Sequence, residues 1–334
     1  MVPTDVLASA TAALLVLWAV VAAWIVGARV RDDRLRRQRG LDARRLAGAG
    51  DPALLSRRRL VRLADAEPGP GASAAARELV RRESPRLIRR AQRRAYGRTH
   101  ALRVLARGES PVAYGLLRAA RRRGSADVRR AVVAIAAEQQ TPAADELLLD
   151  ILADGDHPRS RTATELAPRA PRLVPYLLAL GAHPEADVRY WAVMLLREAA
   201  ADPRAKAAAV EALTDTAGTV RGAAARVLGA CGASDVQPLL RALLADEVFF
   251  VRAHAARAAG DIGAHALARE IAALLADRSW WVRAAAKESL LVLGAAGHAA
   301  ASSMLSADDA FARDGAAEVV SAFEREPQAL VAAG

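Results

Sequence analysis

The sequence contains few of the side chains from which catalytic and metal sites are built. No two of its six histidines lie three or four residues apart, and Cys231 is its one cysteine. This spacing provides no set of metal ligands, and no glycine-rich phosphate loop is present. The adjacent carboxylates Asp32-Asp33 and Asp308-Asp309 point to different faces of a helix, and no nucleophile has a base within reach. We therefore predict a protein that is not an enzyme and that has no catalytic residue, metal or cofactor.

The polar side chains that do recur are arginines, at a fixed interval. The dipeptide Val-Arg begins at residues 128, 188, 220, 251 and 282. The last three gaps are 32, 31 and 31 residues, and Pro158-Arg159 lies midway through the first, longer gap. An aspartate lies six residues before each of the last three arginines, in the pairs Asp215 and Arg221, Asp246 and Arg252, and Asp277 and Arg283. A period of this length is typical of a helical solenoid.

Each period contains the signals for two helices and their turns. Leu243 to Gly263 and Leu274 to Gly294 follow the same pattern position by position. A small residue follows the last four of these valines by four positions and would let helices approach closely, at Ala192, Ala224, Ala255 and Ala286. Glycines suited to a left-handed helix end follow at Gly232, Gly263 and Gly294. First helices are predicted to start at a capping residue followed by proline, at Ser84, Ser110, Thr141 and Asp202.

These residues resemble HEAT repeats, in particular the short bacterial HEAT-like repeats related to phycobilisome lyases. The resemblance covers residues 85–325 and is strongest from 185 to 295. It implies an all-α fold, a right-handed α-solenoid of about seven or eight helix pairs. It also implies a structural ladder of hydrogen bonds between repeats, made by Asp215, Arg221, Asp246, Arg252, Asp277 and Arg283. Arg123 and His183 stand where an aspartate is expected before Arg129 and Arg189, so those two units are expected to lack the ladder bonds.

Residues 6–26 carry no charge and are predicted to form a single transmembrane helix, since 21 residues at about 1.5 Å each span roughly 30 Å. A cleaved signal peptide is the competing interpretation, but the preceding segment has no positive charge and the apolar run is too long. The positive-inside rule puts the amino terminus outside the cell membrane and the repeats in the cytoplasm. The residues expected near the membrane surface are Trp24, Arg29, Arg31, Arg34, Arg36, Arg37 and Arg39.

Charge is divided unevenly along the chain. Residues 28–130 contain 29 arginines and 10 acidic residues, whereas residues 131–334 contain 19 basic and 26 acidic residues. We expect an anchor in residues 1–28, a basic juxtamembrane neck and linker in 29–84, the solenoid in 85–325 and a tail in 326–334. Arginines beside a cytoplasmic leaflet attract anionic lipid headgroups. The structural alternative for the neck is a solvated arginine-rich face.

Paired aromatic residues precede two of the Val-Arg steps. Phe249-Phe250 and Trp280-Trp281 fill this position, and Phe311 fills it in the last unit, whereas other units have Ala186-Asp187 or Gly218-Thr219. Exposed tryptophan and phenylalanine near arginine are typical of interaction hot spots. We predict that a partner protein binds at Phe249, Phe250, Trp280, Trp281 and Phe311, and at Arg129 and Arg189, which lack a matching aspartate. The alternative is that one ring of each pair seals the junction between repeats.

These features together predict a non-catalytic, membrane-anchored scaffold that binds and positions another protein. By analogy with similar membrane-anchored HEAT-like proteins, it would be an accessory subunit of a membrane protein such as a glycosyltransferase of surface polysaccharide synthesis. Nucleic-acid binding is an alternative, against which the acidic balance of residues 131–334 argues. Bilin-lyase activity is a third hypothesis that follows only from the resemblance.

Overall fold

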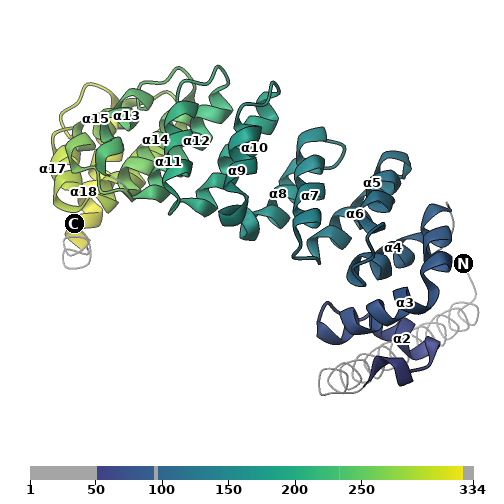
Figure 1. Ribbon diagram of the computed structural model, residues 1–334. Coiled ribbons are helices and arrows are strands. Elements are labelled where there is room, and N and C mark those ends of the chain that lie inside the picture. Colours follow the sequence, from purple (N-terminus) through teal and green to yellow (C-terminus); the bar gives the residue numbers. More distant parts are fainter. Residues whose placement is uncertain (1–50, 94–96, 233, 326–334) are drawn as a thin grey trace, which may run out of the picture. The chain divides into compact units, whose positions relative to one another are not determined.

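The computed structural model describes residues 51–93, 97–232 and 234–325 of the 334-residue chain. Every regular element in these ranges is a helix, which confirms the all-α prediction (Figure 1). The predicted transmembrane segment 6–26 and its flank, with Trp24, Arg29, Arg31, Arg34, Arg36, Arg37 and Arg39, lie outside the described residues. Among the helices that are described, none is long and apolar enough to cross a membrane. The described residues divide into two compact units, one up to Ala144 and one from Asp145 onward.

The described part of the first unit consists of helices packed in chain order. They are η1 (Pro52–Leu54), α2 (Arg57–Ala64), α3 (Pro70–Gln92), α4 (Arg98–Arg107), α5 (Ala113–Arg123) and α6 (Ala126–Ala137). Helix α2 packs on α3, α3 on α4, and both α4 and α5 on α6. The buried side chain of Arg107 donates to the carbonyl oxygens of Ala64 and Ala66 at 2.6 and 2.7 Å, which ties α4 to the end of α2.

Helix α3 runs through the predicted boundary between neck and solenoid. It begins at Pro70, inside the predicted linker Glu67 to Ser73, because proline is well suited to the first turn of a helix. Pro85 does not start a new helix but lies within α3, and the backbone leaves helical geometry at Glu83 (φ −129°, ψ 17°). A proline inside a helix removes one backbone hydrogen bond and bends the helix. The break predicted at Ser84-Pro85 is therefore a kink.

The second unit is a stack of helix pairs that begins within α7 (Pro142–Asp154), a helix shared with the end of the first unit. It continues with α8 (Arg159–Leu166), η2 (Ala167–Arg169), α9 (Ala170–Gly181), α10 (Ala186–Leu196), η3 (Arg197–Ala199), α11 (Pro203–Ala212), α12 (Gly218–Cys231) and η4 (Ser234–Val236). It ends with α13 (Gln237–Leu243), α14 (Phe249–Asp261), η5 (His265–Leu267), α15 (Ala268–Ala273), η6 (Leu274–Ala276), α16 (Trp280–Val292), α17 (Gly294–Ser302) and α18 (Ala310–Arg325). The second helices of successive pairs, α10, α12, α14 and α16, pack side by side.

The valine of each Val-Arg step is the third residue of its second helix, as the repeat frame predicts. Val188, Val220, Val251 and Val282 are buried, and so are the alanines four residues later. The helix-ending glycines Gly232, Gly263 and Gly294 have φ values of +66°, +63° and +58°, which confirms their left-handed conformation. Cys231 is half-buried rather than fully buried, and burial raises the pKa of its thiol.

The starts of the first helices follow the prediction in two of four cases. Thr141 Oγ1 accepts the backbone N–H of Ala144, and Asp202 Oδ1 accepts that of Arg204. After Ser110-Pro111 the chain makes a turn, and α5 begins only at Ala113.

Neighbouring second helices touch through glycines. A Cβ atom added to Gly229 would lie 3.0 Å from Cα of Ala258, and one added to Gly260 would lie 3.2 Å from Cα of Ser289. The Ser289 hydroxyl donates to the carbonyl oxygen of Ala256 at 2.8 Å across the same junction. Helices α12, α14 and α16 therefore approach one another too closely for larger side chains at these points.

Candidate protein-docking surface

A ladder of arginine–aspartate pairs connects successive repeats of the second unit. In three of the Val-Arg steps the arginine donates two hydrogen bonds to the aspartate of the following repeat, at distances from 2.7 to 2.9 Å. The rungs are Arg189 to Asp215, Arg221 to Asp246 and Arg252 to Asp277. Two parallel bonds to a carboxylate fix the orientation of both groups. Of the six residues predicted to form the ladder, Asp215, Arg221, Asp246, Arg252 and Asp277 take part in these rungs, and Arg283 does not.

Each rung also holds the turn that precedes a second helix. Arg221 donates to the carbonyl oxygen of Asp215 in its own repeat at 2.9 Å, and Arg252 does the same with Asp246 at 2.7 Å. The carboxylates of Asp215 and Asp246 each accept the backbone N–H two residues later, at 2.8 and 2.9 Å. These bonds fix the geometry at which α12 and α14 begin.

The pKa values of the ladder aspartates reflect this bonding. The hydrogen bonds from Arg189 and Arg221 lower the pKa of Asp215 and of Asp246. For Asp277, burial alone would raise the pKa, but the hydrogen bonds from Arg252 and Ser279 leave it lowered. All three carboxylates are therefore held in the ionised form that the ladder needs.

The prediction that the unit of Arg189 lacks ladder bonds is wrong. An arginine pairs with the aspartate of the next repeat, so Arg189 requires Asp215 and not the residue at position 183. His183 Nδ1 accepts the backbone N–H of Glu185 at 3.1 Å and so replaces the capping half of the aspartate's role. Because its guanidinium is half-buried in a rung, Arg189 is not a free docking side chain.

One further rung was missed by the sequence analysis. Arg159 pairs with Glu185 at 2.7 Å and with Asp187 at 3.2 Å, two acidic residues that follow His183 in the next repeat. The sequence signal for this rung was an acidic residue two or four positions after the place where an aspartate was expected. Arg129 donates to the carbonyl oxygen of Gly124 at 3.1 Å and contacts no carboxylate among the described residues, so its role in docking stays a prediction.

The aromatic residues of the predicted docking surface lie at the starts of α14, α16 and α18, and we call Phe249, Phe250, Trp280, Trp281 and Phe311 the aromatic row. They belong to the first turns of these helices. The exposed fractions are 43% for Phe249, 58% for Trp280, 59% for Trp281 and 58% for Phe311. The two tryptophan rings make an edge-to-face contact with centroids 4.9 Å apart.

Phe250 differs from the other members of the row because it packs at a junction. A Cβ atom on Gly222 of α12 would lie 3.5 Å from the Phe250 ring and 3.2 Å from His254. Phe250 and His254 are both half-buried there. The sealing role that was the alternative for the whole row therefore holds for Phe250, while the other four rings remain exposed.

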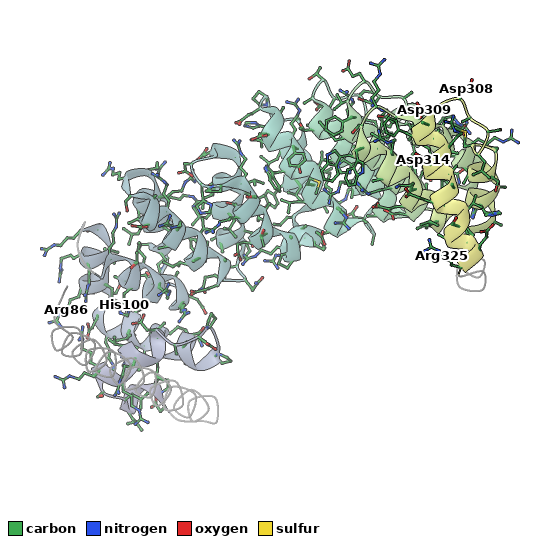
Figure 2. The ribbon with its side chains drawn as sticks, turned by 180° about the vertical axis from the view of Figure 1, so that it is seen from behind. Arg86, His100, Asp308, Asp309, Asp314 and Arg325 are labelled. Carbon is green, nitrogen blue, oxygen red and sulfur yellow. The ribbon has the colours of Figure 1, made fainter. Side chains whose placement is uncertain are left out.

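The last arginine of the predicted ladder contacts the aromatic row. Arg283 has no carboxylate partner among the described residues, and its guanidinium lies 4.2 Å from the centroid of the Phe311 ring. Asp308, Asp309 and Asp314 surround the start of α18 (Figure 2). Asp309 accepts the backbone N–H of Ala312 at 2.9 Å and so caps the start of α18.

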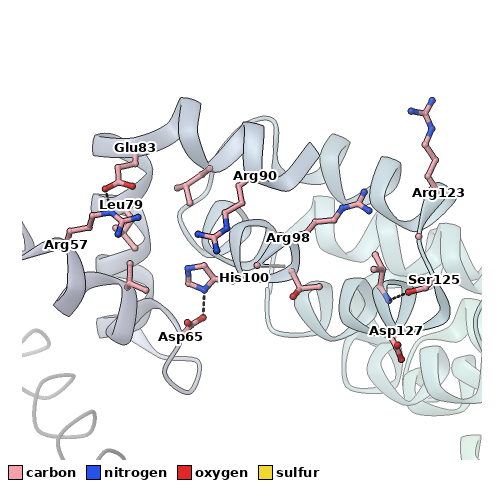
Figure 3. A pocket seen from close by; sticks show the side chains of 16 residues that line it. Arg57, Asp65, Leu79, Glu83, Arg90, Arg98, His100, Arg123, Ser125 and Asp127 are labelled. Carbon is pink, nitrogen blue, oxygen red and sulfur yellow. Dashed lines mark hydrogen bonds and ion pairs between the residues drawn. The ribbon is translucent and has the colours of Figure 1, made fainter. Parts of the chain in front are cut away.

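A hollow of about 990 Å³ lies in the first unit, between α2, α3, α4 and the start of α6, and the sequence analysis did not predict it (Figure 3). Its polar contacts include His100 Nδ1 with Asp65 at 2.6 Å and Arg57 with Glu83 at 2.6 Å. The Arg90 side chain reaches into it and lies against Gly97, where a Cβ atom would be 2.3 Å from Nη2. Within the described ranges, no group of three or more His, Cys, Asp or Glu side chains could hold a metal ion.

Comparisons with known proteins give a family match and several structural similarities. Two overlapping segments, residues 170–251 and 207–291, match the family model for HEAT repeats. No curated protein matches the chain. Human deoxyhypusine hydroxylase in complex with glycerol is 20% identical, with 77% of this chain and 100% of that chain covered and a TM-score of 0.32.

Two other solved structures are similar to the chain at comparable levels. An engineered protein is 17% identical, with 83% of this chain and 87% of that chain covered and a TM-score of 0.41. The Escherichia coli protein YibA is 22% identical, with 70% of this chain and 92% of that chain covered and a TM-score of 0.39. At these identities and scores no activity is assigned to this chain.

The family match covers the part of the chain that carries the ladder and most of the aromatic row. It begins with α9 and ends within α16, and so includes every rung from Arg189 to Asp277. The resemblance to HEAT repeats is confirmed for this segment, while the phycobilisome-lyase type and the membrane-anchored form stay predictions. Residues 170–291 match the family model for HEAT repeats.

Proposed function

We propose that the protein is a non-catalytic scaffold whose HEAT repeats hold a partner protein on the aromatic row. The observation that carries this proposal is the exposure of Trp280 and Trp281, 58% and 59%, at adjacent positions of one helix start. Tryptophans are enriched among the few residues that contribute most of the binding free energy in protein interfaces. Here two of them, flanked by Phe249 and Phe311, are available to be buried by a partner.

The fold itself does not require these rings. The equivalent positions of other repeats have Ala186-Asp187 and Gly218-Thr219, and those helices begin in the same register. The rungs at Asp246 and Asp277 fix the backbone directly before each aromatic pair, so the rings stand on rigid supports. A rigid surface loses little conformational entropy when a partner binds.

The partner we propose is a membrane protein, such as a glycosyltransferase of surface polysaccharide synthesis. Support comes from the apolar segment 6–26 and its basic flank in the sequence, which would tether the scaffold by one transmembrane helix with the repeats in the cytoplasm. A tethered scaffold meets membrane-bound partners at a higher effective concentration than soluble ones. The choice of a glycosyltransferase rests on analogy alone.

The test is site-specific photo-crosslinking from residue 280 of the full chain in its host membrane, followed by rebinding of the purified partner. We expect crosslinks to one membrane protein, and we expect Trp280→Ala with Trp281→Ala to weaken its affinity by about 2 kcal/mol or more. The free energy of unfolding should change by less than about 0.5 kcal/mol, because both rings are exposed.

A matched control removes exposed apolar side chains elsewhere in the same unit. Tyr176→Ala with Val292→Ala takes away two side chains that are each 52% exposed, and should leave the affinity for the partner unchanged. Equal losses in the two double variants, or no loss in the tryptophan variant, would refute docking on the aromatic row.

A further inference from the structure

The second half of α3 presents a face made of arginines. Arg86, Arg89 and Arg90 are exposed and are spaced so that they share one side of the helix, and the exposed Arg93 directly follows its last residue. Leu87 and Ala91 of the same segment are buried, with exposed fractions of 8% and 1%. We call these four arginines the α3 arginine face.

No carboxylate neutralises the α3 arginine face within the described part of the chain. Other arginines of the first unit do have acidic partners, as in Arg57 with Glu83, Arg77 with Glu109 and Arg107 with Glu138. Residues 84–108 contain eight arginines and no aspartate or glutamate. Four like charges in one segment repel one another, and the packing of Leu87 and Ala91 does not need them.

The neighbouring α2 and the short η1 also have exposed arginine and leucine side chains. Arg58 and Arg62 lie four residues apart on α2, are exposed, and likewise have no acidic partner among the described residues. Leu54 in η1, just before α2, is 85% exposed. Exposed apolar side chains beside arginines are typical of segments that lie at the boundary between lipid headgroups and acyl chains.

We propose that the α3 arginine face docks on a bilayer surface rich in anionic phospholipid. This rests on the proposed function in one respect, since the predicted anchor at residues 6–26 would bring the first unit to a membrane. A bilayer is favoured over nucleic acid because Leu54 would have an apolar phase to enter. Arg90 extends into the hollow beside His100 (Figure 3), where a lipid phosphate group could reach its guanidinium.

The test places a fluorophore on α3 of the full chain in vesicles. Gln92, which is exposed at the end of α3, is replaced by cysteine in a Cys231→Ala background and labelled. The vesicles contain phosphatidylcholine alone or mixed with phosphatidylglycerol, together with a lipid that has a quencher on its headgroup. We expect quenching only in the anionic vesicles, and we expect high salt to reduce it.

The matched variants distinguish binding by the α3 arginine face from an effect of net charge alone. Replacement of its four arginines by glutamine should abolish the quenching, since each such arginine strengthens attraction to an anionic leaflet about fivefold and four together contribute several hundredfold. The control replaces four exposed arginines of the second unit that have no described acidic partner, Arg161, Arg197, Arg269 and Arg278. It removes the same charge and should keep the quenching.

Three results would overturn the proposal. They are equal quenching in neutral vesicles, loss of quenching in the control variant, and capture of duplex DNA on neutral vesicles that depends on the same four arginines. Failure of the anchor is detected separately, by alkaline carbonate extraction of the chain from neutral vesicles. In that case, sedimentation of the chain with anionic vesicles, but not of the α3 variant, would still support the α3 arginine face.

Discussion

His254 lies half-buried at the junction between α12 and α14, beside Phe250. Burial lowers the pKa of its imidazole to about 4, and the charges of Arg226 and Arg257 add to the effect. The ordinary value is near 6.5, so between about pH 6.5 and pH 4 the unfolded chain binds a proton that the folded chain does not. Stability should therefore fall as the pH drops through this range.

We expect His254→Gln to remove this part of the pH dependence. The measurement is the urea midpoint of the chain at several values between pH 7 and pH 4, compared with His265→Gln, which changes an exposed histidine of the next turn. Loss of stability from the ladder aspartates begins only below about pH 4, because their pKa values are lowered from 3.8. An unchanged slope in His254→Gln would show that its imidazole is protonated in the folded state.

The rung between Arg221 and Asp246 gives a second prediction for single residues. Arg221→Met leaves Asp246 with one backbone donor in a site where only 9% of its side chain is exposed. Loss of two hydrogen bonds to a charged group should lower the free energy of unfolding by about 2–3 kcal/mol. Arg204→Met, which breaks the exposed pair with Asp202, should cost less than about 1 kcal/mol. Similar costs in chemical denaturation would mean that the ladder does not hold the repeats together.

Contacts between whole helices depend on glycine at the α12–α14 junction. Gly229→Ala would place Cβ 3.0 Å from the backbone of Ala258, and the two helices would have to separate. We expect a loss of about 1–3 kcal/mol in the free energy of unfolding. Gly181→Ala in α9 is the matched control, because nothing lies within 4 Å of the added atom, and it should be neutral or slightly stabilising. Equal effects would show that the junction tolerates a wider spacing.

The second helices could be predicted from sequence because their signals are local. Valine at the third position, alanine four residues later and a left-handed glycine at the end all lie within one helix. The kink in α3 was predicted as a helix start because a serine–proline pair can occur both at the first turn of a helix and at a kink within one. Only the packing of Leu79 before it and Leu87 after it in one unit distinguishes them.

The partners of the ladder could not be read from one repeat. The spacing of six residues is correct, yet the bonded aspartate lies 25 or 26 residues after the arginine, across the junction. The exposure of the aromatic row likewise depends on packing between repeats, which buries part of Phe250 and leaves Trp280 and Trp281 outside. The hollow of the first unit joins four helices and has no signature in any of them.

For the second unit as a whole, the repeat is the element of stability. Deletion of residues 247–277 removes one period, with α14, α15 and both Arg252 and Asp277, while Arg221 and Asp246 stay paired. In a stack where each repeat contacts only its neighbours, the shortened unit should remain helical and unfold cooperatively at a lower temperature. Circular dichroism during heating measures both properties.

A deletion out of register is the control for this prediction. Removal of residues 247–267 leaves Asp277 without Arg252 and joins α13 directly to α15. That variant should be largely unfolded. If both deletions behave alike, the helices do not depend on the repeat frame.

Arg189, Arg221 and Arg252 each bond to the aspartate of the following repeat, so a duplicated period would supply both the arginine and the aspartate that one added junction needs. Recombination between two copies of the 31-residue segment can therefore lengthen or shorten the gene product by whole repeats without any compensating mutation. The number of repeats that carry an aromatic pair at the start of the second helix can in this way change in a single recombination event.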